Sequence, residues 1–159
     1  MQPWRSYSES ARILRLAETH HMSEAAHNVE VLKEAYRRWS ESRGGSVDHW
    51  MGICAADIRF GSLAKGMQGA EYMTAYDSRD ALGEYFAGLG RDWEMLEFVP
   101  EHFVAQGDRV VMLGRCAFRH RHSGKVVASP KADAWRFAGG KAIEYYEYYD
   151  TAQVGAAVG

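Results

Sequence analysis

This sequence of 159 residues lacks the features that identify membrane, secreted or nucleic-acid-binding proteins. No run approaches the roughly 18 apolar residues of a membrane span, and the amino terminus lacks the apolar core of a secretory signal. The formal net charge of -2 gives no electrostatic reason to expect a nucleic-acid partner. We therefore expect neither a membrane nor a nucleic acid among its partners.

Cysteine is scarce as well. Cys54 and Cys116 lie inside apolar patterns and have neither a CxxC nor a zinc-ligand spacing. We interpret them as buried thiols of a cytoplasmic protein, and we expect no metal and no cofactor. The chain has no internal repeat and no linker, so we expect a single domain over residues 23–159, preceded by an N-terminal extension, residues 1–22, with a short helical pattern.

Aromatic residues, in contrast, make up 13% of the chain, mainly as Trp and Tyr. Such side chains suit either an aromatic-lined cavity or a subunit interface. Composition alone does not separate these two uses.

Helical periodicity dominates the first half of the chain. Apolar residues three and four positions apart predict a helix from Ser23, placed to cap it, to about Arg43. Ser46 is placed to begin a second, shorter helix and Ser78 a third, which we expect to stop at the glycines of positions 88 and 90. Residues 57–62 alternate between polar and apolar and predict a first strand.

From residue 93 onward we expect only strands. Residues 94–106 contain Pro100 and predict an edge strand, because proline cannot donate to a sheet ladder. A central strand over residues 110–120 follows, and then two long strands joined by the turn at residues 138–141.

This order of elements predicts an α+β fold. We expect a cone-shaped, curved antiparallel or mixed sheet of about five to six strands, packed against three helices and enclosing a pocket, as an α+β barrel.

The two closing strands, KVVASPKADAWRF and AIEYYEYYD, each place one carboxylate, Asp133 or Glu147, in an aromatic row, because side chains alternate across a strand. In a part-apolar pocket both acids would have raised pKa values suited to acid or base work near neutral pH. The alternatives are that both acids face solvent on a two-sided sheet, or that Lys131 pairs with one of them and keeps it ionised.

The ordered segments resemble the nuclear transport factor 2-like, or SnoaL-like, family over about residues 28–154. The resemblance rests on NVEVLKEAYRRW, CAADIRF, HFVAQGDRVVMLG and KADAWRFAGGKAIEYYEYYDTA. This fold hosts isomerases, dehydratases, polyketide cyclases, epoxide hydrolases and binding proteins, so the resemblance implies a fold more strongly than a reaction.

Two catalytic patterns of the family match in part. The resemblance to ketosteroid isomerases places Tyr36 as the oxyanion-hole tyrosine and Asp133 as its protonated acid. The isomerase base position falls at about Ser62, which has no carboxylate, and Glu147 is a replacement base.

Limonene epoxide hydrolases instead combine an arginine and an aspartate two positions apart on the central strand with an acid on the last strand. Here Arg115 is followed at that spacing by Ala117, while Glu147 matches the last-strand acid. Strand alternation does not settle whether Arg115 faces the pocket. The other face of the strand, with Gly114, Cys116 and Phe118, is the more apolar one. His102 is either a pocket base or a structural residue.

We therefore predict Asp133, Glu147 and Tyr36 as the catalytic residues of a cofactor-independent isomerase, cyclase or epoxide-hydrolase-like enzyme. Its substrate would be a small, mostly apolar or amphipathic organic molecule. The alternative is a non-catalytic small-molecule-binding or dimerisation module.

We expect a homodimer through the open sheet face, where Tyr146 and Tyr148 would otherwise be exposed. The predicted substrate-binding residues are Trp39, Trp50, Phe60, His102, Arg115, Cys116, Phe118, Trp135, Tyr145 and Tyr149.

Overall fold

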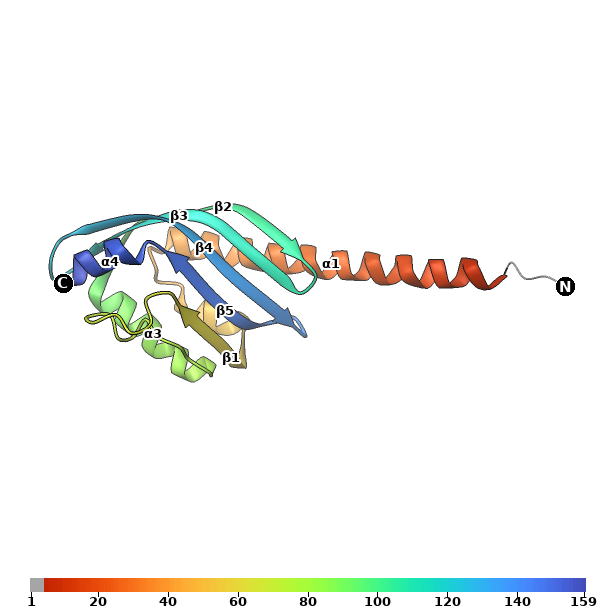
Figure 1. Ribbon diagram of the computed structural model, residues 1–159, viewed down its shortest axis with the longest axis horizontal. Helices are drawn as coiled ribbons and strands as arrows, with labels where there is room; N and C mark the ends of the chain where they lie inside the picture. Colours follow the sequence, from red (N-terminus) through yellow and green to blue (C-terminus); the bar gives the residue numbers. More distant parts are fainter. Residues whose placement is uncertain (1–4) are drawn as a thin grey trace.

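The computed structural model describes the backbone of residues 5–159 and the side chains from residue 23 onward. Within that range the chain forms helices and strands that alternate at first and then give way to a run of strands (Figure 1). The elements are α1 (Arg5–Glu41), α2 (Val47–Ile53), β1 (Cys54–Ser62), α3 (Arg79–Asp92), β2 (Trp93–Gln106), β3 (Arg109–His120), β4 (Val126–Ala138), β5 (Lys141–Tyr149) and α4 (Thr151–Val158).

The strands form one mixed sheet in the order β1-β5-β4-β3-β2. β1 pairs with β5 in parallel, and the other neighbours are antiparallel. Figure 1 shows the sheet curving over α3 and the carboxyl-terminal part of α1. The predicted α+β fold is confirmed, although the sheet is open at its edges and does not close into a barrel.

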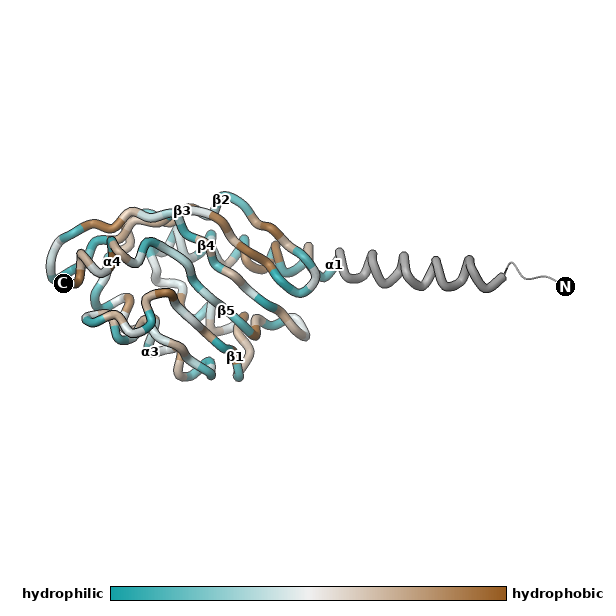
Figure 2. The backbone as a smooth tube through the Cα atoms, viewed as in Figure 1, coloured by the Kyte–Doolittle hydropathy of each residue, from teal (hydrophilic) through white to brown (hydrophobic). Residues whose placement is uncertain are grey.

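The strand β2 lies at the edge of the sheet, as Pro100 predicts. Its pairing with β3 shifts register between Met95 and Glu97 and again between Pro100 and His102. Such bulges bend a strand and increase its twist, which gives the sheet its curvature. Figure 2 shows a hydrophobic stretch on the β2–β3 hairpin close to its turn, and hydrophilic residues at the turn itself.

The first helix is longer than predicted. It begins at Arg5, so Ser23 lies inside it, and the expectation that Ser23 caps its start is wrong. The physical reason is that no proline or glycine occurs between Pro3 and Gly44, so nothing interrupts the helix where the apolar periodicity is weak. Helix α1 ends as predicted, with Gly44 at φ 85° donating its N–H to the Trp39 carbonyl.

Helix α3 begins as predicted, since the Ser78 hydroxyl accepts a hydrogen bond from the Ala81 N–H at 3.1 Å. The predicted stop at its glycines is wrong, because the helix continues to Asp92. Gly88 is required for another reason. A Cβ atom there would lie 2.3 Å from the Tyr72 ring, so glycine permits close packing of this loop residue against the helix.

The chain also ends in a helix that the sequence did not lead us to expect. Helix α4 follows β5 directly and is capped by Asp150, whose carboxylate accepts from the Gln153 N–H at 3.1 Å. Its small residues and Gly155 make a weak helical pattern. Over residues 5–159, no helix is both long and apolar enough to cross a membrane.

Candidate functional site

The hairpin of β4 and β5 places the two predicted acids directly opposite one another. Asp133 pairs in register with Glu147, and Trp135 pairs with Tyr145. The two acids are only 1% and 2% exposed. They therefore face the interior of the molecule, and the alternative in which both acids point to solvent is excluded.

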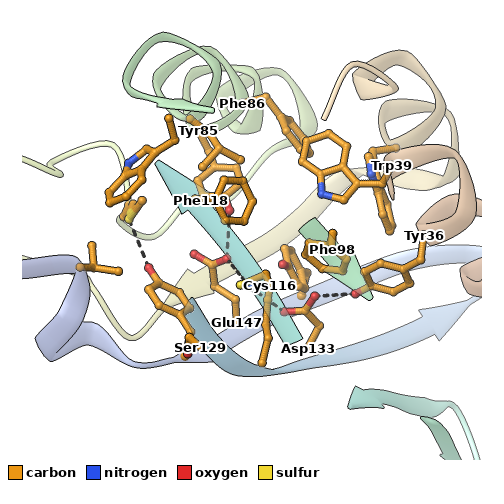
Figure 3. A pocket seen from close by; sticks show the side chains of 18 of the residues that line it. Tyr36, Trp39, Tyr85, Phe86, Phe98, Cys116, Phe118, Ser129, Asp133 and Glu147 are labelled. Atoms are coloured by element: carbon orange, nitrogen blue, oxygen red, sulfur yellow. Dashed lines mark hydrogen bonds and ion pairs between the residues drawn. The ribbon is translucent and has the colours of Figure 1, made fainter. Parts of the chain in front are cut away.

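A pocket of about 90 Å³ lies between the inner face of the sheet and the helices (Figure 3). Its wall is mostly aromatic, with a polar floor on β4 and β5. Trp50, Trp135 and Tyr145 form a parallel stack, with ring centroids 5.3 Å and 4.1 Å apart. Of the predicted substrate-binding residues, those that line the pocket are Trp39, Trp50, Cys116, Phe118, Trp135, Tyr145 and Tyr149.

Three of the predicted substrate-binding residues do not line the pocket. Arg115 lies on the outer face of the sheet and is paired there with Glu97 and Glu101, so the expectation that it binds substrate is wrong. Its neighbour Cys116 points inward, and alternation along β3 directs Arg115 outward.

His102 is exposed on the edge strand β2, which likewise contradicts its predicted place in the pocket. Phe60 is buried, but it packs behind the pocket wall. Its ring centroid is 4.5 Å from that of Tyr85 and 5.1 Å from that of Tyr145.

The polar floor contains a buried ion cluster. The Lys131 ammonium nitrogen lies 3.1 Å from Asp133 Oδ1 and 3.0 Å from Glu147 Oε2. The lysine side chain is only 8% exposed. The alternative in which Lys131 pairs with one acid is therefore correct in kind, but Lys131 bridges both acids. We call these three residues the Lys131 cluster.

The Tyr36 hydroxyl connects helix α1 to this cluster. It donates a hydrogen bond to Asp133 Oδ2 at 2.6 Å and accepts one from the Trp135 indole N–H at 2.9 Å. Its single proton is therefore already engaged. Tyr36 can turn its proton toward a ligand only when Asp133 is protonated and donates to it instead.

Tyr85 on α3 is a site residue that the sequence reasoning missed. Its hydroxyl donates to Glu147 Oε2 at 2.9 Å. The other oxygen, Glu147 Oε1, is buried without a hydrogen-bond partner. In Figure 3 the Glu147 carboxylate points from the sheet into the pocket. The site therefore offers one free, preoriented proton acceptor.

Ser62 lies on β1 at the position that corresponds to the catalytic base in the resemblance to ketosteroid isomerases. Its hydroxyl lies 3.0 Å from that of Tyr149, which also contacts the Met73 sulfur at 3.2 Å. The Lys131 ammonium lies 4.9 Å from the centroid of the Tyr149 ring, within the range of a cation–π contact. The Ser62 hydroxyl therefore helps to hold Tyr149 in place. The residue with a carboxylate oxygen free to accept a proton is Glu147.

Burial and charge act in opposite directions on this cluster. Burial raises the pKa of Asp133, and the nearby Lys131 charge only partly offsets this effect. For Lys131, burial would lower the pKa, but the charges of Asp133 and Glu147 outweigh it and raise the pKa. The pKa of Tyr36 is raised by burial and by the Asp133 charge. With all its groups ionised, the Lys131 cluster has two carboxylates for one ammonium, so a proton on Asp133 makes it neutral.

The structure also relocates the hydrolase-like pattern. A cation and an acid two positions apart do lie beside Glu147, but they are Lys131 and Asp133 on β4 rather than Arg115 and Ala117 on β3. Asp133 is the register partner of Glu147, and Lys131, the register partner of Tyr149, reaches Glu147 with its ammonium group. The signal was present in the predicted inward row of β4, where Lys131 stands next but one to Asp133.

Neither cysteine forms a disulfide. Burial raises the pKa of Cys54 to about 12 and that of Cys116 to about 11, so both thiols are protonated and unreactive near neutral pH. No cluster of three or more His, Cys, Asp or Glu side chains among the described residues is arranged to hold a metal ion.

Comparison with known proteins places this geometry in context. Residues 32–145 match the family described as SnoaL-like domain. No curated protein matches the chain.

Three solved structures illustrate the similarity of fold. An NTF2-like protein from Burkholderia xenovorans LB400 is 20% identical with a TM-score of 0.71, covering 85% of this chain and 98% of its own. A putative SnoaL-like polyketide cyclase from Jannaschia sp. CCS1 is 22% identical with a TM-score of 0.67, covering 84% and 92%. A protein of ketosteroid isomerase-like fold from Catenulispora acidiphila DSM 44928, in complex with trimethylamine, is 17% identical with a TM-score of 0.63, covering 77% and 89%.

Proposed function

The chain belongs to the SnoaL-like domain family, and from this premise we propose that its pocket binds a small, mostly apolar or amphipathic carbonyl compound and acts on it by acid–base chemistry without a cofactor. Fold alone supports only a pocket-forming architecture shared by cyclases, isomerases and binding proteins. The observation that carries the reaction is the Lys131 cluster, which holds two acids and one cation at the floor of an aromatic pocket.

Glu147 is the proposed base. Its Oε2 is held by Tyr85 and Lys131, which leaves Oε1 free to accept a proton from the carbon next to a substrate carbonyl. The Lys131 ammonium lies 3.0 Å from Glu147 Oε2 and fixes the orientation of the carboxylate.

Asp133 is the proposed acid, with Tyr36 as its partner. When Asp133 is protonated, the Asp133–Tyr36 pair hydrogen-bonds the carbonyl oxygen, on which negative charge develops as the C–H bond breaks. Asp133 passes its proton to this oxygen, which gives an enol. Return of a proton to the same carbon restores the ketone, with exchange of hydrogen as the only result, whereas return to another carbon is an isomerisation. Attack of the enol on a second carbonyl forms a C–C bond and closes a ring, and the oxygen of that carbonyl takes up a proton.

Exchange of hydrogen for deuterium beside a carbonyl tests this step for every such reaction. We expect the protein to accelerate exchange of 2-tetralone in D2O, followed by proton NMR. Glu147→Gln should lower the rate about 100-fold or more, as should Asp133→Asn, while Glu101→Gln on the outer face should not change it. Equal rates in Glu147→Gln and in the unchanged protein would refute the proposed base.

Epoxide hydration is a second candidate, favoured by the single observation that Lys131 bridges an acid two positions away and an acid on the last strand. Glu147 would take a proton from water as the water oxygen bonds to the ring carbon. Asp133 would protonate the epoxide oxygen as its C–O bond breaks. Conversion of cyclohexene oxide to the diol tests this reaction, and no diol above the uncatalysed amount would exclude it for this substrate.

A non-catalytic binding protein is the remaining alternative. It is supported by the absence of a carboxylate at Ser62, where the isomerase pattern places its base. Saturable binding of 2-tetralone by calorimetry, with no exchange and no change in Glu147→Gln, would favour this alternative over the enzyme.

We also propose that the outer sheet face forms a homodimer. Tyr146 and Tyr148 are 38% and 44% exposed there, with ring centroids 4.9 Å apart, and Leu113 is 40% exposed. Side chains of this kind gather at subunit contacts. Sedimentation should give the dimer mass, and Tyr148→Glu should shift it to the monomer. A monomer at every concentration of the unchanged protein would contradict the proposal.

A further inference from the structure

The pocket carries a net negative charge when its groups are ionised. Among the residues that line it, the charged side chains are Lys131, Asp133 and Glu147, so two carboxylates face one ammonium. The free carboxylate oxygen, Glu147 Oε1, is buried without a partner and points into the pocket (Figure 3). A buried acceptor left unpaired costs free energy, so a ligand that supplies a donor or a positive charge there is favoured.

The aromatic wall reinforces this preference. Beside the stack of Trp50, Trp135 and Tyr145, the pocket is lined by further aromatic rings, those of Trp39, Phe86 and Phe118, and aromatic rings attract cations through their negative π-density. The molecule already uses such a contact, since Lys131 lies over the ring of Tyr149. The pocket thus combines a free carboxylate oxygen with aromatic surfaces, and it has no second cation to receive an anionic ligand.

We propose that the pocket selects amphipathic amines, with the ammonium group at Glu147 Oε1 and the apolar body among the aromatic rings, and that it rejects carboxylates. This inference rests on the proposed ligand pocket but not on the reaction. An ammonium at Glu147 Oε1 would occupy the atom assigned to the base. Amines should therefore inhibit the exchange of 2-tetralone in competition with the ketone.

Amine binding should also release a proton. The ammonium replaces a proton on Asp133, whose pKa is raised by burial, so affinity should rise with pH while the amine itself stays protonated. The other titratable groups around the cluster hold their protons near neutral pH, because burial raises the pKa of each of them. These groups are Tyr36, Tyr85, Cys116, Tyr145 and Tyr149.

Three probes with the same ring and different head groups test the selectivity: benzylammonium, benzyl alcohol and benzoate. Calorimetry with the full chain should give benzylammonium an affinity about tenfold or more above that of benzyl alcohol, with benzoate weaker than both. Glu147→Gln should abolish the advantage of the amine over the alcohol, and Glu101→Gln should preserve it.

A second measurement uses the unchanged protein and so does not depend on the folding of a variant. Titrations in two buffers of different ionisation enthalpy should reveal proton release when benzylammonium binds, and none when benzyl alcohol binds. Affinity for the amine should be higher at pH about 8 than at pH about 6, a range in which an alkylammonium remains protonated.

The outcomes separate this inference from the proposed function. Binding of benzoate or benzyl alcohol as tightly as benzylammonium would overturn the charge preference and leave the ligand pocket standing. Binding of none of the three would overturn the amine site, and the proposed function would also fall only if 2-tetralone neither bound nor exchanged. Exchange of 2-tetralone that is lost in Glu147→Gln but insensitive to benzylammonium would overturn the amine site alone.

Discussion

Strand β4 carries two cations, one on each face of the sheet, and each bridges two acids. On the inner face, Lys131 bridges Asp133 and Glu147, with side-chain exposures of 8%, 1% and 2%. On the outer face, Arg136 bridges Asp108 and Glu144, with exposures of 37%, 41% and 27%. Each central cation thus contacts two acids, but Glu144 is also paired with Arg59 and Arg109, so the outer cluster has three cations for two acids. The clusters differ as well in their access to water.

Exposure to water reverses the direction in which the pKa of the acid is shifted. The pKa of Asp108 is lowered by its hydrogen bond to Arg136, whereas burial raises the pKa of Asp133 despite its contact with Lys131. Solvent screens the outer cluster and stabilises every charge in it separately. On the inner face the three charges depend on one another, so a change to one of them alters the protonation of the others.

Removing the inner cation should have the largest effect. In Lys131→Met two carboxylates remain buried side by side, and we expect the free energy of unfolding at neutral pH to fall by about 3–5 kcal/mol. The loss should shrink in acid, where the carboxylates are protonated. Urea denaturation at both pH values measures this effect.

The matched control is Arg136→Met, for which we expect a loss of at most about 1 kcal/mol. Equal losses for Arg136→Met and Lys131→Met would mean that burial does not distinguish the two clusters.

Removal of one inner hydroxyl should have an intermediate effect. Tyr36→Phe leaves Asp133 Oδ2 and the Trp135 N–H without their partner, which should lower the free energy of unfolding by about 1–3 kcal/mol. Tyr146→Phe on the outer face, whose ring is partly exposed, is the control and should leave stability unchanged in urea denaturation. An unchanged Tyr36→Phe would show that the buried hydrogen bonds contribute little.

The smallest predicted effect is a change in how stability depends on pH. Because the folded pKa of Asp133 is raised, the folded state holds a proton that the unfolded state loses above pH about 4, so stability falls as pH rises through the folded pKa. Asp108 acts in the opposite sense, since its lowered pKa gives stability that is lost as pH falls below about 4.

The variants Asp133→Asn and Asp108→Asn should therefore remove slopes of opposite sign from a plot of unfolding free energy against pH. Slopes that change in the same direction would contradict the comparison of the two faces.

The sequence predicted best what depends on the period of a strand. Alternation placed Asp133 and Glu147 each in an aromatic row and left open which face those rows take. The structure turns both rows inward, and the tight turn sets the register that places the acids opposite one another. Arg115 was undecided only because both of its neighbouring rows contain apolar residues. The position of Tyr85 was beyond such reasoning, because its contact with Glu147 spans 62 residues and depends on how α3 lies across the sheet.

Helix ends show a second limit. The sequence pattern correctly located the capping residue Ser78, whose hydroxyl bonds within its own helix. The pattern was wrong about Ser23, because the weakly periodic segment before it is still helical. It was also wrong about Gly88, which is needed for close packing against the ring of Tyr72 and does not end the helix.

The parallel stack of Trp50, Trp135 and Tyr145 makes the protein its own optical reporter. The planes of the two indoles are inclined by only 5° and their centroids lie 5.3 Å apart, so their electronic transitions couple. The same Trp135 is hydrogen-bonded to the hydroxyl that serves Asp133. Occupation of the pocket, or a proton moved within it, should therefore alter the near-ultraviolet circular dichroism without any attached dye.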